Sequence, residues 1–367
     1  ITKAAAMVLK ARMYMYENVQ RTGNSVSDNM RKAADICDKL IHEQGTYGTY
    51  SLLTQGSGDG IPAYEYLFTS AAEYNSEVIL DYAAVELNKQ WSTLYSMVPL
   101  TMGANLCQKA PTRALVDSYL NADGSVPADK TVYANRDPRL TATVVYNGYV
   151  WKDRNDKGEY VTKGTINVTS GNDKAGTDNG SPTGFYTRKY FDTTHGKNLE
   201  MWTNIIMMRY ADVLLMYAEA CCMSGEGTAN ITGLEALNKV RQRAGLTPAP
   251  ALDMDNEEYG IKAERRFELW LDDCDRYVDL IRWGDYKDFI TDTSDKGVSE
   301  HWGNECVWLL GMKDKNVRTD DPLDVSNYEV RYDPLSVRGS WNDRLYLFPF
   351  PYAETTQNPN LNQNTGW

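Results

Sequence analysis

Apolar residues recur at helical spacing in several stretches of this chain, and glycine or proline separates one stretch from the next. The first stretch runs from Ala5 to Val19, Gly23-Asn24 interrupts it, and another runs from Ser27-Asp28 to Ile41. Intervals of three and four residues place such side chains on one face of a helix. Residues 1–45 are therefore predicted to form a helical hairpin.

A second group of helices is predicted between residues 206 and 290. The spacing predicts helical runs from Tyr210 to Cys221, from Leu234 to Ala244 and from Asn256 to Trp283. Helix, glycine turn and helix in succession resemble tetratricopeptide-like repeats, although the strict repeat signature is absent. Because one hairpin cannot bury its own apolar face, the hairpins must stack. The predicted fold class is mainly α, with tetratricopeptide-like stacked helical hairpins.

Two long regions do not follow this pattern. Residues 46–205 are rich in turn formers such as Gly56–Gly60, alternate briefly from Thr141 to Trp151, and are polar from Thr162 to Pro182. Residues 291–367 are similar, and we expect long irregular insertions with a few short strands. A long irregular segment within a compact domain usually carries function. We therefore treat residues 46–205 as the candidate ligand face.

Proline limits the structure at the end of the chain. Pro349, Pro351 and Pro359 exclude a regular helix or a central strand there, and the polar residues around them favour successive turns. A tail of this kind has to be held by other parts of the protein. We predict that residues 291–367 form an irregular region packed on the helical scaffold.

The composition excludes several classes of function. A net charge of −12 without any basic cluster argues against binding to nucleic acid, which requires grouped Lys and Arg. The six cysteines form no Cys-x-x-Cys pair and have no nearby histidine, so no zinc or redox site is predicted. The sequence also lacks a nucleophile elbow, a phosphate loop and a dinucleotide fingerprint.

Several charged residues lie among apolar helix positions. Glu219 is surrounded by alanine and leucine. Arginines recur on the predicted helices, at Arg209, Arg241, Arg265, Arg276 and Arg282. We interpret these residues as ion pairs that fix the register between repeats, so Glu219→Ala should lower stability and leave ligand affinity nearly unchanged. A catalytic acid would look the same in sequence, so a glycoside hydrolase stays an open alternative.

Sequence blocks in a fixed order connect the chain to a known family. The blocks are Asn75–Ile79, Arg136–Leu140, Met208–Ala220, Leu237–Leu246, Glu264–Leu269, Asp279–Gly284 and Leu347–Trp367. Together they resemble the C-terminal portion of the SusD/RagB family, which comprises surface glycan-binding lipoproteins. The chain departs from the family pattern at Phe350, Thr365 and Trp367, and it has Asp273-Cys274-Asp275-Arg276 where the family commonly has Glu-Gly-x-Arg.

This resemblance implies a fold, a function and partners. The expected fold is SusD-like, and the expected protein is not an enzyme. It binds an oligosaccharide or polysaccharide at the cell surface and delivers it to a SusC-like TonB-dependent transporter of the outer membrane. A signal peptide, a lipid-anchored cysteine and a helical portion are expected ahead of Ile1. The alternative is a peptide-binding or protein-interaction scaffold, because helical repeats commonly bind peptides.

A sugar site needs exposed flat rings flanked by hydrogen-bonding side chains. The stretch from Tyr82 to Tyr95 supplies this mixture, and the resemblance places ligand-contacting aromatic residues in this part of the insertion. We rank Trp91 first, followed by Tyr82, Tyr95 and Asn88. The alternative is a helix that packs its aromatic face against the protein.

A second candidate group is Tyr149, Trp151 and Trp202, near the polar stretch. The alternative for this group is cross-strand packing, which suits alternating aromatic residues. Nearby, Asp153–Gly158 begins like a calcium loop, but its twelfth position is Gly164 instead of Glu, so a tight hairpin turn is favoured. Some relatives carry calcium, which leaves calcium as the one cofactor kept open. No catalytic residue and no metal ligand is assigned.

Overall fold

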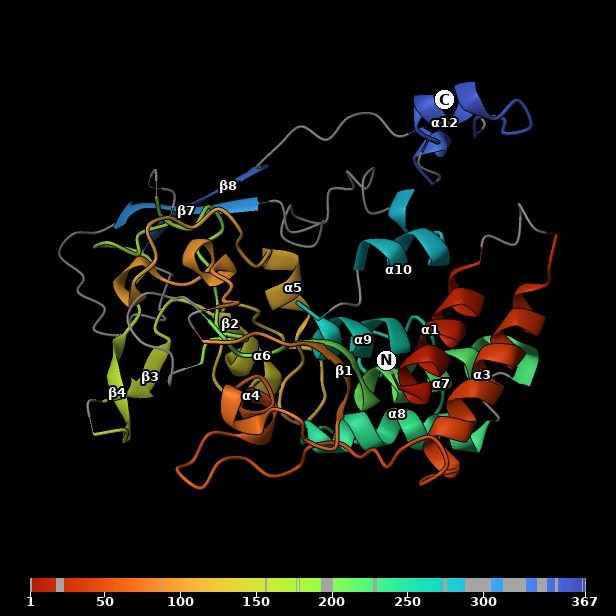
Figure 1. Cartoon of the computed structure of the whole chain (residues 1–367). Helices are drawn as coiled ribbons and strands as arrows, with labels where there is room; N and C mark the ends of the chain where they lie inside the picture. The colour runs from red at the N-terminus through yellow and green to blue at the C-terminus, as the bar shows by residue number, and fades with distance from the viewer. Residues whose placement is uncertain are drawn as a thin grey trace.

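A computed structural model describes most of the chain. The described residues are 2–17, 23–86, 88–155, 157–175, 177, 179–192, 201–226, 230–272, 276–287, 305–312, 328–334, 342–346, 349–364 and 366. Figure 1 shows the longer helices gathered at one side of the molecule, with short strands and irregular segments at the other. The mainly helical fold class is confirmed.

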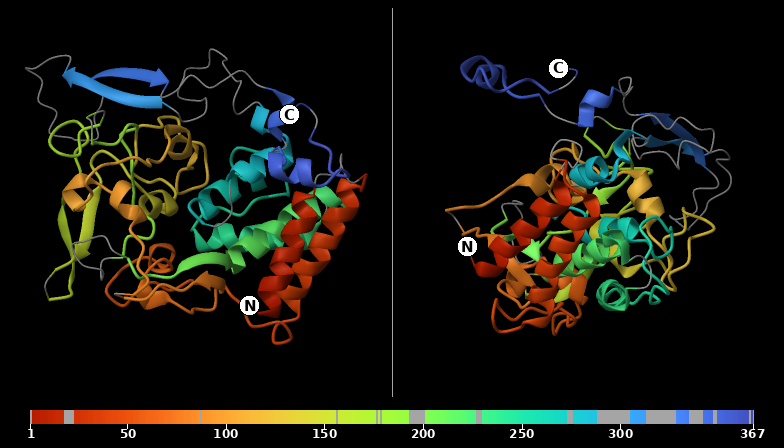
Figure 2. Two further views of the ribbon diagram at one scale, coloured as in Figure 1. Left: turned by 45° about the horizontal axis from the view of Figure 1, so that its top comes forward. Right: turned by 90° about the vertical axis from the view of Figure 1, so that its right-hand side faces the viewer.

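The first helical hairpin forms as the spacing predicts. It consists of α1 (Lys3–Tyr16) and α3 (Val26–His42), which lie side by side in Figure 2. The helix α3 starts two residues earlier than expected, because the Ser25 hydroxyl caps it by accepting the backbone N–H of Asp28. Val19, which the prediction placed in the first helix, lies outside the described residues.

The second hairpin stacks on the first. It consists of α7 (Tyr210–Cys221) and α8 (Ile231–Arg243), separated by a single π-helical turn, η4 (Cys222–Glu226). Helix α7 packs against both α3 and α8, and each of its residues is buried. A helix that is apolar all round is expected in such a central position. Stacked helical hairpins are therefore the observed scaffold.

The third predicted run, Asn256–Trp283, is wrong as a single helix. It contains two shorter helices, α9 (Ile261–Leu269) and α10 (Arg276–Trp283). Helix α9 ends because Trp270 is extended and Leu271 has a left-handed φ of 64°. No glycine marks this break, and apolar residues continue at helical spacing across it. The break could therefore not be detected from the sequence.

The insertion contains short helices and short paired strands. The helices are α4 (Ala63–Tyr66), η1 (Ser70–Ala72), η2 (Thr93–Ser96), η3 (Leu100–Met102), α5 (Arg113–Ser118) and α6 (Pro138–Thr143). The antiparallel strand pairs are β1 (Val78–Tyr82) with β6 (Ile205–Arg209), β2 (Val144–Val145) with β5 (Tyr186–Thr187), and β3 (Val150–Arg154) with β4 (Tyr160–Thr165). The single strand predicted from Thr141 to Trp151 is wrong, because Gly148 makes a turn with a φ of 82° between β2 and β3.

The C-terminal region contains β7 (Glu305–Met312), which pairs with β8 (Tyr328–Pro334), then η7 (Asp343–Tyr346) and α12 (Tyr352–Gln357). The exclusion of a helix from the tail is wrong for α12, which fits between Pro351 at its start and Pro359 beyond its end. The Gln363 side chain holds the tail by bonding both backbone groups of Phe350. Tyr352 is 83% exposed, so packing of this region on the scaffold stays a prediction. Thr365 and Trp367 lie outside the described residues.

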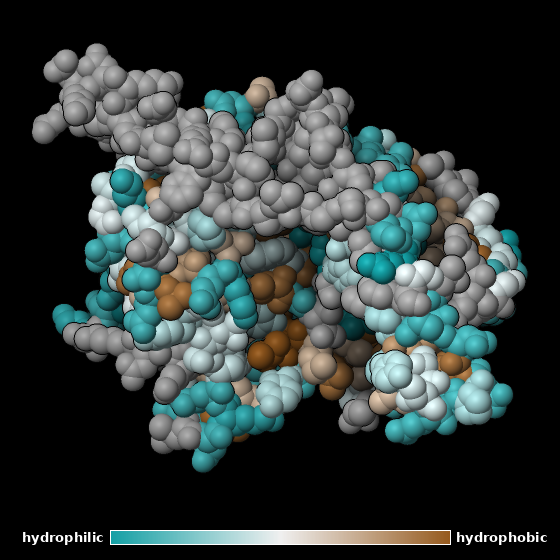
Figure 3. All heavy atoms as spheres, turned by 90° about the horizontal axis from the view of Figure 1, so that it is seen from above, coloured by the Kyte–Doolittle hydropathy of each residue, from teal (hydrophilic) through white to brown (hydrophobic). Residues whose placement is uncertain are grey.

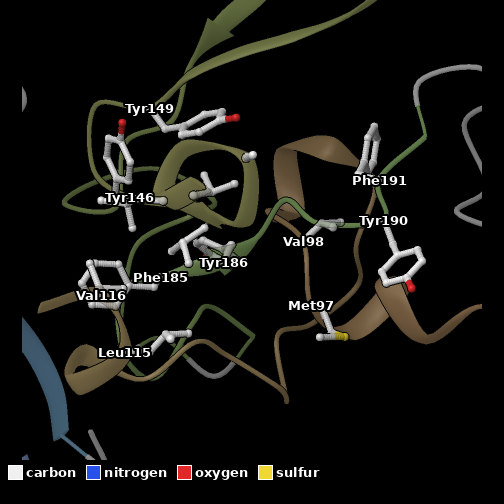
Figure 4. Packing of buried hydrophobic residues seen from close by; sticks show 14 of the residues in the cluster. Met97, Val98, Leu115, Val116, Tyr146, Tyr149, Phe185, Tyr186, Tyr190 and Phe191 are labelled. Carbon is white, nitrogen blue, oxygen red and sulfur yellow. The ribbon is translucent and has the colours of Figure 1, made fainter. Parts of the chain in front are cut away.

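The protein has two hydrophobic cores, one in the insertion and one among the stacked helices. The insertion core surrounds Trp151 and Tyr186 and is shown from close by in Figure 4, and the helix core lies between α1, α3, α7 and α8. Helix α9 serves both, because Phe267 belongs to the insertion core and Leu269 to the helix core. Seen from above in Figure 3, apolar residues lie recessed between hydrophilic residues on both sides.

Candidate functional site

The candidate site is the loop from Tyr82 to Trp91, which leaves the end of β1. Tyr82 pairs with Ile205 of β6, so the loop starts at a fixed strand position. Val85 and Lys89 exchange two backbone hydrogen bonds of 3.0 and 2.9 Å, which close a tight turn. Trp91 then pairs with Met201 through backbone bonds of 2.9 and 2.8 Å. Both ends of the loop are therefore fixed to the segment that leads into β6.

Asn204 fixes this loop through hydrogen bonds. Its side-chain oxygen accepts the backbone N–H of Ala84 at 3.0 Å, and its side-chain nitrogen donates to Asp81 at 2.8 Å. Its backbone N–H donates to Glu73 Oε1 at 2.8 Å. Burial raises the pKa of Glu73, and the carboxylates of Asp81 and Asp192 raise it further, against the effect of the Asn204 bond. Asn204 therefore ties the loop to the segment ahead of β1.

Tyr82 and Asn88 are exposed on this loop. Half of the Tyr82 side chain is accessible, and the Lys89 Nζ lies 3.8 Å from the centroid of its ring. A cation at this distance from an aromatic ring is attracted to it and limits the motion of the ring. An accessible ring beside exposed amide and ammonium groups is the arrangement that a sugar requires.

Trp91 was ranked first as a sugar-contacting residue, which requires an exposed ring, but its ring is not exposed in this way. Its indole is half-buried, packs edge-on against Tyr190 with ring centroids 6.1 Å apart, and donates Nε1–H to the Thr203 carbonyl at 2.8 Å. Tyr95 is half-buried against the same core, and Trp202 is half-buried beside Thr203. The indole of Trp91 therefore positions the loop. The described residues from Tyr82 to Trp91 form no helix, and Tyr95 lies in the short helix η2.

Trp151 is corrected as a candidate, because its side chain is 0% exposed. Its ring packs against Phe191 at 4.8 Å and Tyr149 at 6.1 Å, and the Arg188 guanidinium lies 4.8 Å from it. A ring enclosed on every side offers no face to a sugar. The alternative considered for this group was cross-strand packing; for Trp151 the structure instead shows packing in the insertion core, since its strand partner is Gly164.

The structural role expected for Glu219 is confirmed. Its carboxylate is fully buried and binds the two terminal nitrogens of Arg282, one of them at 2.8 Å. Trp283 donates Nε1–H to the same carboxylate at 2.8 Å, and Arg265 Nε lies 3.7 Å away. These partners come from α9 and α10, so Glu219 joins three helices.

A larger buried ionic network joins the insertion to the scaffold. Ion pairs were predicted from the sequence for Arg209 and Arg241, but Arg139 and Arg243 and the carboxylates that these arginines bind were missed. Arg209 binds Glu77 at 2.8 Å and also binds Glu268 of α9, while Arg139 binds Glu268 at 2.9 Å. Arg243 of α8 binds both Glu77 and Glu268. Burial raises the pKa of Glu268, but Arg243, Arg209 and Arg139 outweigh this effect and hold the pKa well below its usual range.

One sequence signal could have indicated this network. Glu264 and Glu268 stand four residues apart on α9 and therefore share a face, and Arg139 binds both, at 2.6 and 2.9 Å. Arg139 is more than a hundred residues away in sequence, and Arg209 and Arg243 come from other elements, so the pairing itself is visible only in the fold. Each carboxylate in the network has an arginine partner, which leaves none poised for acid or base chemistry.

The calcium-like stretch forms a hairpin turn, as its favoured interpretation states. Asn155 Oδ1 accepts the N–H groups of Lys157 and Glu159, and Asp153 accepts the N–H of Arg154. These oxygens accept hydrogen bonds within the turn between β3 and β4; Asp156 lies outside the described residues. Within the described ranges, no group of three His, Cys, Asp or Glu could hold a metal. Among the helices described, none has the length and apolarity to cross a membrane.

Comparisons with known proteins agree with this fold. A family model described as the SusD family matches residues 76–367. A SusD-like protein of Bacteroides ovatus is 27% identical over 180 residues, which cover 47% of this chain and 31% of that protein. A SusD-like carbohydrate-binding protein of Bacteroides fragilis superposes with a TM-score of 0.69 at 22% identity, over 98% of this chain and 64% of that one.

A further similar structure was solved with a xylogluco-oligosaccharide; it has a TM-score of 0.63 at 17% identity, over 97% of this chain and 65% of that one. Such low identities show the fold alone. The chain spans about a third of the length of the Bacteroides ovatus relative and less than two thirds of each of these two structures. The family model nevertheless matches most of the chain. On these grounds the chain belongs to the SusD/RagB family.

Proposed function

We propose that this chain is part of a non-catalytic protein that binds a glycan at the cell surface. The observation that carries the proposal is the half-exposed Tyr82 ring, held on a loop whose two ends are fixed by β6 and by the Trp91–Met201 pair. A sugar would place its apolar C–H face on this ring, and Asn88 and Lys89 would bind its hydroxyl groups.

The cellular role follows from family membership. We propose that the whole protein is a lipid-anchored component of the outer membrane that passes its glycan to a SusC-like TonB-dependent transporter. A shallow site built on one or two rings gives modest affinity, and modest affinity allows the ligand to leave for the transporter. A carbohydrate-binding relative and a neighbour solved with an oligosaccharide support the glycan-binding part of this role.

The order of the candidate sugar-contacting residues changes because of their accessibility. Tyr82 replaces Trp91 as the first candidate for stacking on the sugar, because half of its side chain is accessible while the indole of Trp91 packs against the insertion core. Asn88 and Lys89 are exposed hydrogen-bonding side chains on the same loop. Trp91→Ala would weaken binding through a misplaced loop and would also lower stability.

Calorimetric titration with xylogluco-, cello-, malto- and manno-oligosaccharides tests the proposal. The protein should bind at least one of them, and Tyr82→Ala should weaken that binding about three- to tenfold while the melting temperature stays unchanged. Tyr352→Ala, which removes a ring that is 83% exposed on α12, is the matched control and should bind like the wild type. Equal affinity of Tyr82→Ala and the wild type would remove this loop from the site.

Two further measurements separate the alternative functions. Binding to a peptide pool with no binding to any glycan would favour the interaction scaffold over glycan capture. New reducing ends after incubation with a polysaccharide would identify an enzyme. The proposal predicts neither result.

A further inference from the structure

Tyr74 combines three features that the fold does not explain. It lies between η1 and β1 with a φ of 59°, in the left-handed region that favours glycine and is costly for a bulky residue. Its side chain is 75% exposed. In the part of the chain that the structure describes, no hydrogen bond and no ring contact of this side chain is found. The fold therefore carries a strained backbone at a residue whose ring lies mostly in solvent.

Other bulky residues with positive φ provide a comparison. Tyr190 has a φ of 66°, but it is buried, packs against Phe68 and Trp91, and accepts the N–H of Ile206 at 3.1 Å through its hydroxyl. Leu271 has a φ of 64° and packs against the insertion core. In both cases buried contacts offset the strain. Tyr74 lacks this compensation, which indicates that its ring serves a contact outside the protein.

The backbone at Tyr74 is held firmly by its neighbours. Asn75 donates its side-chain N–H to the Ala72 carbonyl at 2.7 Å, and its side-chain oxygen accepts the Glu77 N–H at 2.8 Å. A position fixed in this way presents its side chain with little loss of freedom when a ligand binds.

Asn204 brings Tyr74 to the Tyr82 loop. Asn204 binds Glu73, the residue before Tyr74, and Asp81, the residue before Tyr82. Each of the two tyrosines therefore comes directly after a residue that is hydrogen-bonded to the buried Asn204. A pair of exposed rings on neighbouring segments suits successive sugar units of a chain.

The charge around Asn204 restricts the ligand. These two segments carry the carboxylates of Glu73, Asp81 and Glu86, and the ammonium group of Lys89 carries the opposite charge. A local excess of carboxylate repels an anionic sugar such as a uronic acid.

We propose that Tyr74 is a second ligand-contacting ring and that, with Tyr82, it binds an uncharged oligosaccharide. This inference rests on the proposed function and extends it in two respects, namely the second ring and the charge class of the glycan. It also predicts that the fold gives up stability at Tyr74 in order to present that ring.

The test is Tyr74→Asn, because asparagine tolerates the left-handed region and lacks the ring. Its melting temperature should rise by about 1 to 2 °C as the strain is relieved. Its affinity for the neutral oligosaccharide that binds best to the wild type should fall about three- to tenfold. Tyr352→Ala again serves as the control for loss of an exposed ring, and an oligogalacturonide serves as the anionic probe.

Each outcome has a distinct meaning. A wild type that binds no glycan at all would contradict the proposed function and this inference together. If Tyr82→Ala weakens binding and Tyr74→Asn does not, the second ring is refuted and the proposed function stands. Tighter binding of the oligogalacturonide than of the neutral oligosaccharides would refute the assigned charge class.

Discussion

Single residues in this protein divide into those that hold the fold and those that face outward. Several charged side chains belong to the first kind, since Glu219, Arg209 and Glu268 are all buried and paired. A buried carboxylate with a guanidinium partner adds little net stability over an apolar pair, but removing one partner leaves a charge buried alone. Single substitutions in these pairs should therefore be costly.

Glu219→Ala tests this at one position. It leaves Arg282 and the Trp283 N–H without their shared acceptor, so the free energy of unfolding should fall by about 3 to 5 kcal/mol. Urea denaturation measures this change, and glycan affinity of the folded variant should stay unchanged. Glu235→Ala, at an exposed position of α8, is the control and should stay within about 0.5 kcal/mol of the wild type. Equal stability of the two variants would contradict the structural role.

Lys189 gives a prediction about pH. Burial lowers its pKa to about 8, against the effect of Asp272 at 3.0 Å, whereas in the unfolded chain the pKa is about 10.4. Between about pH 8 and pH 9 the unfolded chain therefore binds more protons at this residue than the folded one, so Lys189 alone contributes a rise in stability of about 1 kcal/mol. The buried Cys37 and Cys107 thiols, whose pKa values burial raises, act in the opposite direction over the same range, so the contribution of Lys189 is read as a difference between two proteins.

Lys189→Met removes this titration. Chemical denaturation of both proteins at several pH values in this range should show the stability of the wild type rising by about 1 kcal/mol relative to that of Lys189→Met. The same pH dependence in both proteins would show that Lys189 is not the group responsible.

At the residue scale, sequence showed which kinds of side chain mattered but not where they point. Glu219 was predictable as a buried charge because its neighbours are apolar. Tyr82 and Trp151 could not be separated in this way, since both lie in short alternating stretches and only burial distinguishes the exposed ring from the enclosed one. Tyr74 left no signal, because its strain is a property of the backbone.

At the scale of elements, apolar spacing located α1, α3, α7 and α8 because each packs one or more faces on a neighbouring helix. The break between α9 and α10 was missed, since Leu271 adopts the left-handed conformation without being glycine. The pairing of β1 with β6 was also missed. These strands are more than a hundred residues apart, and no local turn signal links them.

Gly233 offers a test of how closely α7 and α8 approach. A Cβ added there would lie 2.7 Å from the Cβ of Cys221 and 3.0 Å from Leu252 Cδ1. Gly233→Ala should therefore lower the free energy of unfolding by about 1 to 3 kcal/mol, despite the better helix propensity of alanine. Gly58→Ala, where nothing lies within 4 Å, should be neutral and serves as the control in thermal denaturation. A neutral Gly233→Ala would mean that the two helices lie further apart.

At the scale of the whole molecule, two hydrophobic cores share one buried ionic junction. Helix α9 contributes Phe267 to the insertion core, Leu269 to the helix core, and Glu264 and Glu268 to the junction between them. The insertion is thereby fixed to the stacked hairpins, so the Tyr82 loop at its surface is rigidly supported. A firm platform that presents a few exposed rings suits a protein that holds a glycan and releases it intact.

The most direct measurement is a crystal structure of the protein with the neutral oligosaccharide that titration selects. The account predicts a sugar ring lying parallel to the face of Tyr82, with the next unit against Tyr74 and with every glycosidic bond intact. A sugar bound elsewhere, without contact to either tyrosine, would contradict it.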